Sequence, residues 1–232
     1  MAGVSRLQYA TDIRLIRVMC SGKVDLSYIF RAFMNGMDGV FVGACRLGEC
    51  NYITHGNYSA LKNVLIARKI MGYIGIDPER LWIRFMNSSD GQKFAENINA
   101  FISKISKLGP LGSENPQNGN GLKPKLEAVQ RIVPYLRLVE RERLRASFKT
   151  EEEHRLFFER EDINKLIREL VYEKLTMAQI MELLKEKTLS IGEIAKEVAL
   201  TPSEAAKYLG LLSKQGFVRF DQGLKGYGLA GR

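Results

Sequence analysis

The chain has 232 residues, 45% of them hydrophobic, and a formal net charge of +9. This length allows one large domain or two smaller ones, and the apolar content is sufficient for a buried core. No apolar stretch approaches the roughly 20 residues of a membrane span, and the N-terminus lacks a secretory signal, so we expect a cytoplasmic protein outside the membrane. A basic surface suits nucleic acid or an acidic protein partner, and charge alone does not separate the two.

The first 110 residues alternate strand and helix patterns. Apolar runs predict buried strands at 13–19, 39–44 and 81–86. Helical spacing of apolar residues predicts a helix after each strand, at 25–35, at about 57–74, and after the N-cap candidates at 87–90. This order predicts an α/β fold, a parallel sheet flanked by helices in a flavodoxin-like three-layer arrangement.

The remainder of the chain divides into three segments. Residues 111–123 are rich in glycine, proline and asparagine, which indicates a linker. Residues 124–174 alternate charges with apolar residues at helical spacing, which predicts a solvent-exposed α-helical arm. His154 lies among glutamates of that arm, and we expect it at the surface.

Residues 175–232 have the clearest local signals. Ser190–Glu193 and Thr201–Glu204 both match the capping box, and they predict short helices at 191–198 and 202–214. A hairpin around Gly223 follows. Three helices and a hairpin predict a winged-helix domain, but a net charge of only +2 is a weak electrostatic basis for DNA binding.

Three cysteines follow the predicted strands. Cys20 comes after 13–19, Cys45 after 39–44, and Cys50 lies five residues beyond Cys45. Because parallel strands end at one edge of a sheet, we expect these thiols to lie together. Thiolates are soft ligands, and Cys-x4-Cys is part of one known iron–sulfur spacing.

Other roles for the cysteines remain open. Free cysteine is often a small buried residue, so the thiols could be structural. Zinc is less favoured because the chain has no Cys-x2-Cys or His-x3-5-His pair. A catalytic thiol is less favoured again, because no base can be placed beside it.

Three further residues surround the thiols in the sequence. Arg46 and Glu49 lie between Cys45 and Cys50, where they could adjust the charge of a cluster, contact a partner, or form a solvated pair. His55 could bind or hydrogen-bond a cluster, or cap a neighbouring helix. No nucleotide-binding glycine motif is present.

Five short segments carry a family resemblance: SRLQY (5–9), IRVMCSGKVD (16–25), DGVFV (38–42), CRLGECNY (45–52) and THGNY (54–58). With them, residues 1–110 resemble the delta subunit of methyl-viologen-reducing (F420-non-reducing) hydrogenase. The resemblance implies a [2Fe–2S] cluster, with Cys20, Cys45 and Cys50 as ligands inside a shell of Arg46, Glu49 and His55. It also implies relay of electrons between a hydrogenase, formate dehydrogenase or methylenetetrahydrofolate-reductase-type partner and the flavin subunit of heterodisulfide reductase.

The chain departs from the family at its start. Family members have an additional strand and a Cys-x-x-Cys turn immediately upstream of the segment that resembles residues 1–6. A [2Fe–2S] cluster normally has four ligands, so the fourth ligand is missing from this chain. We expect either that Met1 is an internal methionine of a longer reading frame or that the cluster is lost.

These observations predict an iron–sulfur electron-transfer subunit of an oxidoreductase complex, with no substrate site of its own. The division would be 1–110 for the cluster domain, 111–123 for the linker, 124–174 for the arm, and 175–232 for a winged helix used in assembly. The alternative is a redox-sensing winged-helix regulator that binds DNA.

Overall fold

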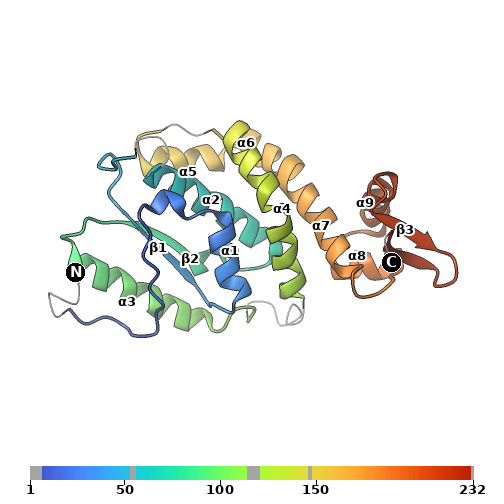
Figure 1. The fold of residues 1–232 in the computed structure, drawn as a ribbon, viewed down its shortest axis with the longest axis horizontal. Helices are drawn as coiled ribbons and strands as arrows, with labels where there is room; N and C mark the ends of the chain where they lie inside the picture. Colours follow the sequence, from blue (N-terminus) through green and yellow to red (C-terminus); the bar gives the residue numbers. More distant parts are fainter. Residues whose placement is uncertain (1–6, 53–55, 114–120, 146–147, 231–232) are drawn as a thin grey trace. The chain divides into compact units, whose positions relative to one another are not determined.

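The computed structural model describes residues 7–52, 56–113, 121–145 and 148–230 (Figure 1). The chain divides into two compact units. The first unit comprises Met1–Gly119 with Leu144–Asn164, and the second comprises Asn120–Arg143 with Lys165–Arg232. None of the helices in the described ranges combines the length and the apolar character that a membrane span needs.

The first unit is an α/β structure built on a small parallel sheet. Its elements are η1 (Ser21–Lys23), α1 (Leu26–Met34), β1 (Val40–Ala44), α2 (Asn57–Ile74), η2 (Pro78–Arg80), β2 (Leu81–Phe85), α3 (Gly91–Leu108) and α5 (Glu151–Glu159). These bounds confirm the predicted strands at 39–44 and 81–86 and the three predicted helices. The strands β1 and β2 lie side by side in Figure 1 and pair in parallel, with Val42 opposite Ile83.

The two faces of this sheet are covered by different helices. Phe41 and Trp82 are paired across the strands, and both rings contact Phe101 of α3 at centroid distances of 5.5 and 5.4 Å. Alternate residues point to the opposite face, where Val42 and Ile83 are buried. The helices α1 and α2 contact the strands as well. The alternation of apolar residues in both strands therefore buries both faces.

The predicted strand at 13–19 is wrong, because the structure shows an irregular segment without strand pairing there. Its apolar side chains are exposed, with Leu15 at 70%, Ile16 at 77% and Met19 at 98%. Within the described residues the parallel sheet has only the strands β1 and β2. Apolar β-branched composition favours an extended backbone, but a strand also needs a neighbour that accepts and donates hydrogen bonds.

A buried arginine joins the end of α3 to the sheet. The Arg80 side chain is fully buried, and its guanidinium donates to the carbonyls of Asp38, Leu108, Gly109 and Pro110 at 2.9–3.1 Å. Carbonyls in the last turn of a helix have no partners within the helix, so this side chain satisfies them. The contact therefore fixes α3 against the start of β1.

The helix α5 corrects the prediction for His154. This side chain is 0% exposed, and its ring stacks on Tyr58 of α2 with the centroids 5.5 Å apart. A capping box between Thr150 and Glu153 begins α5, so the acidic residues occupy its first turn while the next residue turns inward. The glutamates next to His154 in the sequence therefore led to the wrong prediction that its side chain is exposed.

The second unit is mostly helical. Its elements are α4 (Leu122–Glu142), η4 (Arg168–Tyr172), α7 (Glu173–Leu183), α8 (Ile191–Glu197), α9 (Pro202–Lys214), β3 (Val218–Asp221) and β4 (Gly226–Leu229); α6 (Glu161–Ile167) spans the boundary between the units. The helix α4 packs along α7, and its Val129 and Val133 are buried, so this part of the predicted exposed arm has a buried face. The buried carboxylate of Glu182 pairs with Arg131 at 2.6 Å and also with Lys185.

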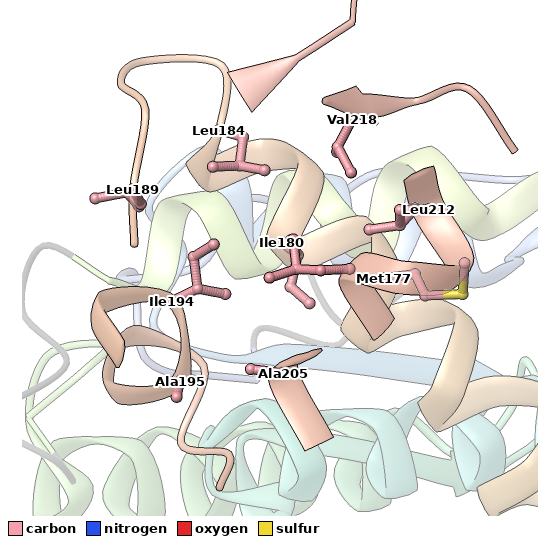
Figure 2. Packing of buried hydrophobic residues seen from close by; sticks show 10 residues of the cluster. Met177, Ile180, Leu184, Leu189, Ile194, Ala195, Ala205, Leu212 and Val218 are labelled. Carbon is pink, nitrogen blue, oxygen red and sulfur yellow. The ribbon is translucent and has the colours of Figure 1, made fainter. Parts of the chain in front are cut away.

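The C-terminal part of this unit has its own apolar core (Figure 2). Side chains from α7, α8, α9 and β3 meet there, among them Ile180, Ile194 and Leu212. The strands β3 and β4 form an antiparallel hairpin, and Leu189 makes an isolated antiparallel bridge to Tyr227 of β4. Both predicted capping boxes are present at the starts of α8 and α9.

Candidate functional site

The three cysteines are free thiols, each partly exposed, at three turns of the first unit. Cys20 ends the irregular segment and caps η1, and its Sγ accepts a hydrogen bond from the backbone N–H of Gly22 at 3.4 Å. Cys45 follows β1 directly. Cys50 lies in the loop between β1 and α2.

The structure brings these three sulfurs together. Burial raises the pKa of Cys45 to about 11, and a hydrogen bond with Cys50 and the charges of Cys50 and Cys20 contribute to this rise. Cys50 also interacts through hydrogen bonds with the side chains of Cys45 and Cys20. The thiols are therefore neighbours, although residues 13–19 do not form the strand from which this was predicted.

The thiol of Cys50 occupies a different electrostatic environment. Burial alone would raise its pKa, but backbone N–H groups of Asn57 and Tyr52 and the side chains of Cys45 and Cys20 hydrogen-bond to it, and the net effect lowers the pKa below its ordinary value. Asn57 is the first residue of α2, where no side chain caps the helix. The free N–H groups and the dipole of a helix N-terminus favour a thiolate.

Asn57 also organises the cysteine loop through its side chain, which is fully buried. Its Nδ2 donates to the carbonyls of Cys45 at 2.9 Å and Arg46 at 2.8 Å, and lies 3.6 Å from the Sγ of Cys45. Asn57 was not among the site residues predicted from the sequence. The available signal was its position as the first residue of the predicted helix that follows the loop.

Gly56 allows the close approach of Cys50 to α2. A Cβ at this position would overlap the Sγ of Cys50 and would lie 2.6 Å from the carbonyl oxygen of Tyr52. Any side chain here would therefore displace the thiol or the loop.

The residues expected around the thiols have separate environments. Arg46 forms an ion pair with Asp90 at 2.8 Å. A backbone N–H of Asn87 and then this arginine lower the pKa of Asp90 below its ordinary value. Glu49 is exposed, and its backbone N–H donates to the carbonyl of Arg46 at 3.1 Å. His55 lies outside the described residues.

The donor set fits an iron–sulfur cluster in part. Three soft thiols adjoin one another, and two buried polar atoms on neighbouring residues, the Oγ of Ser21 and the Oδ1 of Asn57, have no hydrogen-bond partner within the described ranges. Across those ranges, however, no group of three or more His, Cys, Asp or Glu side chains is placed so that it could hold a metal ion. Three thiols are also one fewer than the four protein ligands that such a cluster normally uses.

Comparison with known proteins places this region in a family. The family model for the delta subunit of methyl-viologen-reducing hydrogenase matches residues 1–109. The F420-non-reducing hydrogenase iron-sulfur subunit of Archaeoglobus profundus is 43% identical over 114 residues, which are 49% of this chain and 82% of that protein. The vhc iron-sulfur subunit of the F420-non-reducing hydrogenase of Methanococcus voltae is 42% identical over 109 residues, which are 47% of this chain and 75% of that protein.

A larger protein contains a similar region. It is a subunit of the ferredoxin/F(420)H(2)-dependent CoB-CoM heterodisulfide reductase of Methanosarcina acetivorans, and it is 41% identical over 117 residues, which are 50% of this chain but only 15% of that protein. All three cysteines lie within the residues that the family model matches. The chain therefore belongs to the methyl-viologen-reducing hydrogenase delta subunit family.

Proposed function

We propose that this chain is an iron–sulfur electron-transfer subunit of a heterodisulfide-reductase-like complex. It would relay electrons between a hydrogenase, formate dehydrogenase or methylenetetrahydrofolate-reductase-type partner and a flavin subunit. The observation that carries this proposal is the mutual interaction of three thiols within the region shared with hydrogenase iron-sulfur subunits. The relationship to a heterodisulfide reductase subunit supports the choice of acceptor.

The proposed cofactor is a [2Fe–2S] cluster held by Cys20, Cys45 and Cys50. The fourth ligand would come from a residue other than these three cysteines. Such a cluster supplies one-electron transfer when bound. The chain's own residues would stabilise the thiolate of Cys50 through the backbone N–H groups of Asn57 and Tyr52. We propose Arg46, Glu49 and His55 as the surrounding shell.

We further propose that the first unit is a flavodoxin-like domain and that residues 175–232 form a winged-helix-like module used in assembly. The order α7, bridge at Leu189, α8, α9, β3, β4 supports the second assignment, because three helices followed by a β-hairpin are typical of a winged helix. We propose that the chain has four functional parts: a cluster domain (1–110), a linker (111–123), a helical arm (124–174) and the winged-helix-like module (175–232). This division differs from the compact units in the placement of residues 144–164.

The rival function is a redox-sensing DNA-binding regulator. The exposed apolar side chains of the C-terminal part, Leu211, Phe217, Phe220 and Leu224, favour a protein partner over DNA. Lys207 on α9 lies 4.0 Å from Glu173, which offsets its charge. This pairing reduces the positive charge that α9 could offer to phosphates.

Purification of the native complex would test the proposal. We expect flavin and iron–sulfur subunits to co-purify, together with visible absorption and an EPR signal that Cys45→Ser abolishes or strongly shifts. Asn51→Ser is the matched control, since Asn51 is exposed in the same loop. An unchanged spectrum in Cys45→Ser would remove Cys45 from the ligand set. A sequence-specific, salt-sensitive DNA shift without co-purifying subunits would support the regulator instead.

A further inference from the structure

Residues 144–164 lie beyond the region that the family model matches, yet they belong to the first unit. The helix α5 within this segment packs against α2. The ring of His154 stacks on Tyr58 at an interplanar angle of 17°, and Phe148 meets the imidazole edge-on with the centroids 5.4 Å apart. The contact therefore involves the second residue of α2.

A hydrogen bond reinforces this stacking. The hydroxyl of Tyr58 donates to the backbone carbonyl of Lys149 at 2.8 Å, just before α5 begins. The Nδ1 of His154 lies 2.9 Å from the carbonyl of Thr150, so the imidazole is also anchored to its own helix. Together these contacts join the start of α5 to the first turn of α2.

That first turn is the part of α2 that faces the cysteine site. Tyr58 follows Asn57, whose backbone N–H donates to Cys50 and whose side chain donates to the carbonyls of Cys45 and Arg46. The N-cap residue, Gly56, has no side chain that could cap this turn. First turns of helices fray readily when they lack a cap, so an external contact has a large influence here.

We propose that His154 is a positioning residue for the iron–sulfur site: by stacking on Tyr58, it holds the first turn of α2 so that Asn57 keeps its hydrogen bonds to the cysteine loop. This inference rests on the proposed function for its effect on the cluster. The first part of the proposal, the structural step, is that His154 holds the first turn of α2 in place. This step applies to the chain with or without a cluster. The extension beyond the shared family region thus takes part in the site without supplying a ligand.

The histidine acts in this arrangement as a flat ring. Its Nε2 is buried and has no hydrogen-bond partner within the described residues, which costs free energy. A phenylalanine would keep the stacking and remove this unsatisfied atom. His154→Phe should therefore preserve the position of Asn57, whereas His154→Ala should release it.

A matched control comes from the same helix. Phe158 is 2% exposed and lines a cavity with Leu65 and Lys69, near the middle of α2. Phe158→Ala also truncates a buried aromatic side chain of α5, but away from the first turn of α2. It separates a general loss of stability from a loss of positioning.

Hydrogen–deuterium exchange of the full chain tests the structural step. We expect His154→Ala to accelerate exchange of the Asn57 amide, which donates to Cys50, about tenfold, and Phe158→Ala and His154→Phe to leave it near the wild-type rate. Tyr58→Phe, a milder variant that loses only the hydroxyl, should give a smaller acceleration. Unchanged exchange in His154→Ala, or an equal acceleration in Phe158→Ala, would overturn the proposal.

The purified complex tests the effect on the cluster. Hydrogen bonds to cluster sulfurs help set the reduction potential. We expect His154→Ala to make the potential more negative and to alter the visible circular dichroism, with His154→Phe restoring both. A changed exchange rate with no iron in the wild-type complex would reject the proposed function and keep the structural step. A changed exchange rate with an unaltered potential would reject the positioning role.

Discussion

The helices that begin beside the cysteine loop differ at their starts from the two short helices of the C-terminal part. In the second unit, α8 and α9 begin with Ser190 and Thr201, each joined to a glutamate in a reciprocal capping box. In the first unit, α2 begins after Gly56 with no side-chain cap. The carboxylate of Asp90, before α3, accepts hydrogen bonds from Arg46 and a backbone N–H of Asn87 rather than capping its own helix.

The difference shows which helix starts satisfy their backbone N–H groups with residues of the same turn and which depend on another segment. A capping box satisfies N–H groups at the start of a helix with residues of the same turn. The start of α2 instead directs the N–H of Asn57 to the thiol of Cys50. Its order therefore depends on the cysteine loop, and the order of the loop depends on it.

The largest effect should come from Asn57→Ala. This change leaves two partly buried carbonyls, those of Cys45 and Arg46, without their donor. We expect a loss of about 3 kcal/mol in the free energy of unfolding of the first unit, measured by urea denaturation. A loss below about 1 kcal/mol would show that the loop does not rely on this side chain.

Replacement of glycine by alanine should change the free energy of unfolding in opposite directions at the starts of α2 and α8. Gly56→Ala introduces a Cβ that overlaps the Sγ of Cys50, and we expect it to destabilise the first unit by about 2 kcal/mol. Gly192→Ala, near the start of α8, meets nothing within 4 Å and should stabilise by about 0.5–1 kcal/mol. Thermal unfolding of both variants measures this contrast, and effects of the same sign would contradict it.

The thiols should differ in reactivity toward iodoacetamide in the cluster-free chain. Because the pKa of Cys45 is raised to about 11, its thiolate fraction at pH 8 is about 100-fold below that of an ordinary thiol. The greater nucleophilicity of its thiolate offsets part of this difference, so we expect about tenfold slower alkylation. The rate at Cys45 should rise with pH to about 11, while Cys50, whose pKa is lowered, should level off earlier.

Mass spectrometry of timed samples resolves the two sites. Denatured protein is the control, since both thiols then have ordinary environments. Equal rates in the folded chain would contradict the described electrostatics.

The smallest effect should come from a cap of the second unit. Thr201→Ala removes the hydroxyl that accepts from the backbone at the start of α9. We expect a loss of about 1 kcal/mol in stability of the C-terminal part and no change in thiol reactivity. Thr201→Ser is the control and should be close to wild type. A change in the alkylation of Cys50 would show that the two helix starts are not independent.

Local signals predicted most of the helices because their causes are local. The boxes at Ser190 and Thr201 require only residues three positions apart, and both are present. The same pattern at Thr150 begins α5, although it was not used to predict a helix start. The apolar runs of β1 and β2 also predicted their pairing, since a buried parallel strand has few polar positions.

Non-local contacts account for the failures. Residues 13–19 have the composition of a strand, but pairing depends on a neighbour that composition does not provide. His154 follows three glutamates, yet contact with Tyr58 buries it. At the candidate site, strand order was the basis for predicting that the cysteines lie together, but residues 13–19 form no strand, and the position of Asn57 depends on the path of the loop after β1.

The close approach of Cys50 to Gly56 has an evolutionary consequence. A side chain at position 56 and a thiol at position 50 cannot both occupy the space between the loop and α2. Selection that maintains the thiol therefore also maintains the glycine, six positions away. A descendant that lost the cysteine would lose the contact with the thiol, but a Cβ at position 56 would still lie 2.6 Å from the carbonyl oxygen of Tyr52, so the glycine would be retained until the loop also changed its path.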